Sequence, residues 1–167
     1  MKIEVVVTYR DHWFNRLVRW WGINWTHAAL RYKTGKKWRV FETAAFGTIE
    51  RDWEGFIEGV DEYVTFETEK KLTKTQETKL ISFAWGNVGK MYNLFRLAWV
   101  AVRYLLQGRK PQSFTVTSHI CSSFTDSCFK HVGIDLVEGD DIWVTPDDLS
   151  KSKLLAVVEG GEWLNSS

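Results

Sequence analysis

One cysteine of this chain, Cys121, stands in a segment that could make its thiol a nucleophile. The segment 117–124 (Thr-Ser-His-Ile-Cys-Ser-Ser-Phe) predicts the abrupt start of a helix, because Thr117 or Ser118 can cap its free N–H groups. Cys121 would then lie in the first turn, where the helix dipole favours an anion. A thiolate there has a lowered pKa and is a usable nucleophile at neutral pH. The alternative is a buried, inert cysteine on a core helix, since free cysteines are commonly buried.

A histidine and a glutamate are predicted to face each other on a hairpin. Residues 25–32 and 37–44 have the composition of two strands, and Thr34-Gly35 between them fits a two-residue loop. In that register His27 lies directly opposite Glu42, with Cβ atoms ~5 Å apart. A carboxylate beside an imidazole selects its tautomer and raises its basicity. The alternative is a surface ion pair, which contributes little to stability. The same register pairs Ala29 with Val40 and Arg31 with Trp38.

The other histidines are weaker candidates for a base. His119 is two residues before Cys121, and a helix places such residues on different faces. His131 is near the predicted helix end, where its charge suits the dipole, so we assign it a structural role. His12 has no evident partner. The cysteines and histidines have no recognised zinc-ligand spacing, so we expect neither a metal nor another cofactor.

The composition predicts one folded domain over residues 1–167. The chain is 44% hydrophobic and 26% charged, and its net charge of +1 gives no reason to expect nucleic acid or membrane as a partner. Its two cysteines, seven residues apart on one helix, are too distant to form a disulfide, which fits a reducing compartment. The first residues do not form a signal peptide. We therefore expect a cytoplasmic protein, or a phage- or virus-encoded product made without one.

Hydrophobic periodicity predicts an α+β fold in which an antiparallel sheet packs against helices. Residues 94–107 form a helix that is apolar nearly all round, so it is either deeply buried or in contact with an apolar surface, and burial is the better interpretation. Residues 45–59 are predicted to be a connection anchored by Trp53 and Phe56. The remaining strands are predicted at 3–8, 62–67 and 154–159, and the remaining helices at 12–21, 73–88 and from 145 onward.

Over residues 3–151, the order of these segments resembles circularly permuted papain-like enzymes of the YiiX type, in the NlpC/P60 superfamily. In that family a histidine on an early strand precedes a cysteine at the start of a later helix. The matching segments are Asn24 to Leu30 around His27, Val40 to Ala44 around Glu42, Gly89 to Asn93 around Tyr92, Ile120 to Phe124 around Cys121, Gly133 to Leu136, and Thr145 to Leu149. Residues 94–107 make a longer apolar helix than the resemblance leads us to expect.

The resemblance and the residues together imply a thiol hydrolase of the cysteine amidase or peptidase type. Cys121 would attack a carbonyl carbon, His27 would exchange the proton, and Glu42 would orient the imidazole ring. The Cys121 backbone N–H would bind the oxyanion, and Tyr92 would either add a hydroxyl there, shape the groove or pack in the core.

Three functions remain open at this point. The expected substrate is an amide, in a small peptide or a peptidoglycan fragment. The alternatives are a lipid or thioester acyl substrate acted on by the same triad, and a non-catalytic binding or structural module of phage type.

Overall fold

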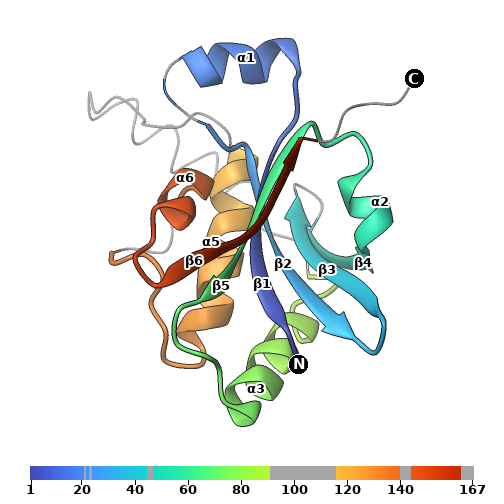
Figure 1. Cartoon of the computed structure of the whole chain (residues 1–167), viewed down its shortest axis with the longest axis vertical. Coiled ribbons are helices and arrows are strands. Elements are labelled where there is room, and N and C mark those ends of the chain that lie inside the picture. The colour runs from blue at the N-terminus through green and yellow to red at the C-terminus, as the bar shows by residue number, and fades with distance from the viewer. Residues whose placement is uncertain (21, 23, 45–46, 91–115, 140–143, 163–167) are drawn as a thin grey trace.

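The computed structural model describes residues 1–20, 22, 24–44, 47–90, 116–139 and 144–162 (Figure 1). Within them, six strands form one sheet in the order β4-β3-β2-β1-β5-β6, and all neighbouring strands are antiparallel. The predicted α+β fold with an antiparallel sheet is confirmed. The strands are β1 (Ile3–Tyr9), β2 (His27–Thr34), β3 (Lys37–Ala44), β4 (Gly47–Asp52), β5 (Glu62–Thr68) and β6 (Leu155–Glu162). The helices are α1 (Trp13–Trp20), α2 (Trp53–Ile57), α3 (Lys74–Trp85), α5 (Val116–Lys130) and α6 (Pro146–Ser150).

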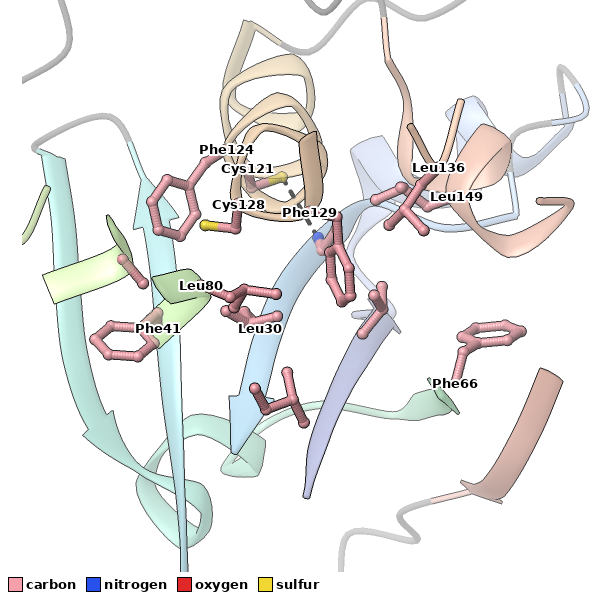
Figure 2. Close-up of a cluster of buried hydrophobic side chains, with 14 of the residues drawn as sticks. Leu30, Phe41, Phe66, Leu80, Cys121, Phe124, Cys128, Phe129, Leu136 and Leu149 are labelled. Atoms are coloured by element: carbon pink, nitrogen blue, oxygen red, sulfur yellow. Dashed lines mark hydrogen bonds between the residues drawn. The ribbon is translucent and has the colours of Figure 1, made fainter. Parts of the chain in front are cut away.

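The sheet buries side chains on both of its faces. Alternate residues of β1 separate accordingly: Val5 and Val7 join the larger core, to which α3 and α5 contribute, whereas Val6 packs with Phe56 of α2 on the other face. Because β1 is central and covered on both sides, its sequence is a nearly continuous apolar run. The larger core extends from β2 to α5 and fixes the helix that carries Cys121 against the strand that begins at His27 (Figure 2).

Two helices begin with capping boxes. Thr73 and Gln76 form a reciprocal capping box at the start of α3, and Thr145 does the same with Asp148 at the start of α6. The predicted end of α3 near Val88 is too late, because the helix ends at Trp85 with Gly86 as its C-cap. The prediction of a plain connection over residues 45–59 is wrong, since that stretch contains β4 and α2, and β4 pairs with β3.

Candidate active site

The β2–β3 hairpin brings His27 and Glu42 together, although not in the predicted register. Ala29, rather than His27, lies opposite Glu42, and the predicted pairs of Ala29 with Val40 and Arg31 with Trp38 are also wrong. The observed turn is closed by Thr34 and Lys37, and its first central residue, Gly35, has φ of 59°. This shift of two residues keeps both side chains on the same face of the sheet, because side chains alternate with a period of two.

The His27 imidazole contacts the Glu42 carboxylate. Nε2 of His27 lies 3.3 Å from Oε2 of Glu42, and the two side chains are 25% and 12% exposed. Burial opposes the ionisation of Glu42, but hydrogen bonds from His27 and Arg51 hold the pKa of that carboxyl below its ordinary value. Glu42 is therefore a carboxylate, and not a carboxylic acid, beside the ring.

Helix α5 supplies the third group, the thiol of Cys121. The residue is fully buried, and its Sγ accepts a hydrogen bond from the backbone N–H of Ala28 at 3.4 Å, the dashed line in Figure 2. Burial acts to lower the pKa of His27. The charge of Cys121 and a hydrogen bond with it, followed by those of Glu42, outweigh burial and raise that pKa to about 10. The imidazole is thus in contact with both partners that the sequence assigned to it, and it stays protonated at neutral pH.

The position of Cys121 within its helix differs from the prediction. Helix α5 begins at Val116, so Thr117 and Ser118 lie inside it and Cys121 is in the second turn. Neither Pro nor Gly stands between Val116 and Cys121 to prevent a helix from beginning early. The dipole of the first turn therefore does not account for an activated thiol, and the Cys121 N–H is not among the free groups of the helix start. The Ala28 N–H and the His27 ring both interact with Cys121.

Arg51 is part of this cluster, and the sequence interpretation missed it. Its Nη1 donates to Oε1 of Glu42 at 2.9 Å, and its Nη2 donates to the carbonyl oxygen of Gly55 in α2. Because β4 was not predicted, nothing placed Arg51 beside β3. The local sequence contains no strand signal, since Gly47–Asp52 does not alternate between apolar and polar residues and its isoleucine, Ile49, is 48% exposed.

A buried carboxylate fixes the segment that leads into His27. Asp147, in the first turn of α6, accepts hydrogen bonds from the backbone N–H groups of Asn24 and Trp25 at 3.1 to 3.2 Å. Burial raises the pKa of Asp147, and these two backbone donors lower it. The contact ties the start of β2, and with it His27, to α6.

The second cysteine, Cys128, lies on the same helix in a contrasting environment. Cys128 is fully buried, and burial together with the negative charge of Asp126 raises the pKa of its thiol. Cys121 and Cys128 thus have the same exposure but opposite electrostatic surroundings.

The remaining candidates do not enter the cluster. His131 stacks on Phe83 at 4.5 Å between ring centroids, which agrees with the structural role assigned to it, and His12 is exposed before α1. The side chain of His119 is not among those that the structure describes. Tyr92 and residues 94–107 lie outside the described residues. In the part of the chain that the structure describes, no helix is long and apolar enough to cross a membrane.

The fold is shared with a solved protein of the YiiX type. The chain matches a crystal structure described as the metalloprotein YiiX from Escherichia coli O157:H7, DUF1105, with a TM-score of 0.69 and 15% sequence identity. The match covers 95% of this chain and 96% of that one, so the resemblance to YiiX extends to the whole architecture. No protein-family model and no curated protein matches the chain.

The description as a metalloprotein applies to the matched YiiX structure. Across the described ranges of the present chain, no group of three or more His, Cys, Asp or Glu side chains is arranged to hold a metal ion. The donor set of the described residues does not fit a metal centre.

Proposed function

We propose that this protein is a cysteine hydrolase that cleaves an amide bond through a Cys121 acyl-enzyme. The observation that carries the proposal is the position of the His27 ring, which contacts the Cys121 thiol and the Glu42 carboxylate and has its pKa raised to about 10 by them. Strongly shifted pKa values arising from a specific pair of partners are typical of functional sites. The order of the parts, with the histidine strand before the cysteine helix, supports a permuted papain-like interpretation of the fold.

The proposed resting state of the site is an ion pair between the His27 imidazolium and the Cys121 sulfur. The interactions with Cys121 and Glu42 raise the pKa of His27 to about 10, so the ring carries a proton before any substrate binds. The Ala28 N–H, directed at the sulfur, would stabilise a negative charge there. Since Nε2 of His27 contacts Glu42, Nδ1 is the nitrogen that exchanges its proton at the sulfur side.

The reaction then proceeds in two steps. In acylation the Cys121 sulfur bonds to the carbonyl carbon, the C–N bond breaks, and the imidazolium of His27 gives its proton to the departing amine. In deacylation His27 takes a proton from water, the resulting hydroxide bonds to the acyl carbon, and the C–S bond breaks to restore the ion pair. Glu42 stays ionised throughout and holds the ring in the orientation that both transfers need.

The proposed mechanism requires a substrate to reach the Cys121 sulfur past the more exposed of the two reacting side chains, that of His27. Cys121 has no exposed surface, whereas the His27 side chain keeps a quarter of its surface open.

Competitive alkylation tests the proposal, with Cys128 as an internal control. A limiting dose of iodoacetamide, followed by peptide mass spectrometry, should label Cys121 faster than Cys128, because both are buried but only Cys121 has an imidazolium partner. His27→Ala should abolish the difference. Equally slow labelling of both thiols in the native protein would instead support a non-catalytic module.

The bond that is cleaved is tested separately with matched substrates. Dipeptide amides should be hydrolysed, and Cys121→Ala should abolish the activity while Cys128→Ala retains it. Hydrolysis of acyl esters or thioesters with no action on amides would replace the amidase assignment by an acyl hydrolase that uses the same three residues.

A further inference from the structure

The carboxylate of Glu42 is held from two sides by two different cations. Oε2 faces Nε2 of His27 at 3.3 Å, while Oε1 accepts from Nη1 of Arg51 at 2.9 Å. A carboxylate has two oxygens and several lone pairs, so it can serve both partners only in one orientation of its plane. The contact with Arg51 therefore selects which oxygen, and which direction, Glu42 offers to the imidazole.

Arg51 is itself held in place at its far end. Its Nη2 donates to the carbonyl oxygen of Gly55, and the Gly55 N–H donates to Oδ1 of Asp52, the N-cap of α2. The guanidinium thus connects β4, β3 and α2, and its planar fork is suited to two acceptors in fixed directions. A Cβ atom built at Gly55 would lie 3.2 Å from Nη2 of Arg51 and 2.7 Å from Oδ1 of Asp52, so the surroundings are closely packed.

We propose that Arg51 is a positioning residue for the thiol chemistry, holding Glu42 in the orientation that serves His27. This inference rests on the proposed function, and it adds a fourth member to the Cys121, His27 and Glu42 set. Arg51 touches neither the sulfur nor the ring in this arrangement. It acts through Glu42, whose charge it preserves in a largely buried site.

Loss of Arg51 should affect the acidic side of the pH profile of Cys121 alkylation. The charged groups in direct contact with Glu42 are His27 on β2 and Arg51 on β4. Cys121 of α5 interacts with His27, and Asp52 follows Arg51 in the chain. Burial acts to raise the pKa of Glu42, and the two cations keep it low. Without Arg51, protonation of Glu42 begins at a higher pH, and below that pH the imidazolium loses its carboxylate partner.

The test is the pH dependence of Cys121 alkylation in Arg51→Met and Arg51→Gln. The second variant keeps a donor for the Gly55 carbonyl and guards against a folding defect in the first. Both should move the acidic limb of the alkylation profile upward by about one pH unit, since an opposite charge at this range shifts a carboxyl pKa by about one unit or more. At a pH below the limb, this shift corresponds to an about tenfold lower rate of Cys121 alkylation. Arg51→Lys, which keeps the charge, should recover part of the shift.

The matched control is Arg39→Met. Arg39 and Glu50 form an ion pair across the same β3–β4 ladder, and the Arg39 side chain is 33% exposed against 36% for Arg51, but Glu50 contacts Tyr32 rather than His27. Arg39→Met should leave the acidic limb unchanged. If the Arg51 variants fold and have the native pH profile while His27→Ala still slows the alkylation of Cys121, the positioning role is refuted and the proposed function stands. If His27→Ala has no effect on the alkylation of Cys121, the proposed function fails and this inference fails with it.

Discussion

Replacing Cys121 by alanine should lower the pKa of His27 substantially. The imidazole starts from an ordinary pKa of 6.5 and reaches about 10 in the folded protein, against the effect of burial. An opposite charge in contact accounts for about 1 to 3 units, so His27 in Cys121→Ala should titrate at about 7 to 9. Glu42→Gln should produce a smaller decrease, because the effects of Cys121 on His27 exceed those of Glu42. Removing both partners leaves only burial, and the pKa should then fall below 6.5.

The assay is an NMR titration of protein labelled at the histidine Cε1 carbon. The chain has four histidines, and His27→Gln identifies the resonance in question. Wild-type His27 should remain protonated through neutral pH and titrate near 10. Titration near 6.5 in the wild type, or an unchanged value in Cys121→Ala, would refute the ion pair.

The same shift predicts the direction of the pH dependence of stability. Because the folded-state pKa of His27 is higher than the unfolded value, its protonation stabilises the fold fully below pH 6.5. That contribution is lost as the pH rises from 6.5 towards 10. Denaturant unfolding at several pH values should show this loss in the wild type and much less of it in Cys121→Ala.

Three further substitutions test the structure around the site. Asp147→Ala should cost about 1 to 3 kcal/mol, because two backbone N–H groups at the entry to β2 lose their acceptor; urea unfolding measures the loss, and Cys121 alkylation should slow as His27 loses its support. Phe124→Ala should cost about 3 to 5 kcal/mol, since the side chain is almost completely buried beside Cys121; a cost under 1 kcal/mol would contradict the described packing. Thr73→Ala should cost about 1 kcal/mol through loss of the α3 cap and leave the alkylation ratio of the two cysteines unchanged.

The hairpin explains why a site can be predicted from a register that is wrong. A Thr34-Gly35 loop of type I′ would need positive φ at the β-branched Thr34, which is strongly disfavoured. With Gly35 as the first central residue, only Gly35 takes a positive φ, and the register moves by two. An even shift preserves the face of every side chain, so the contact between His27 and Glu42 was predictable even though their direct opposition was not. A shift of one residue would have placed His27 and Glu42 on opposite faces of the sheet, and the predicted contact would have been wrong.

The helix start and Arg51 were harder to predict for a different reason. Ser and Thr are favoured at a helix start but also occur within helices, so Thr117 and Ser118 could not by themselves mark where α5 begins. Arg51 becomes relevant only once β4 is paired with β3, and that pairing is a tertiary choice that residues 47–52 do not encode locally. What the sequence does specify is the chemistry of the side chains that the sheet later assembles.

The end of the β2–β3 ladder gives the site its final component. Pairing of the two strands runs from Thr34↔Lys37 to Ala29↔Glu42, while β3 continues alongside β4 as far as Ala44↔Gly47. Ala28 lies just beyond that pairing, and its N–H donates to the Cys121 sulfur. A buried backbone donor needs an acceptor, and here the acceptor is the atom on which the proposed mechanism requires negative charge. Where the two strands part, the sheet brings a backbone N–H and the His27 ring to one sulfur, and the Glu42 carboxylate to that ring. In the proposed mechanism this arrangement, more than the helix dipole, would activate Cys121.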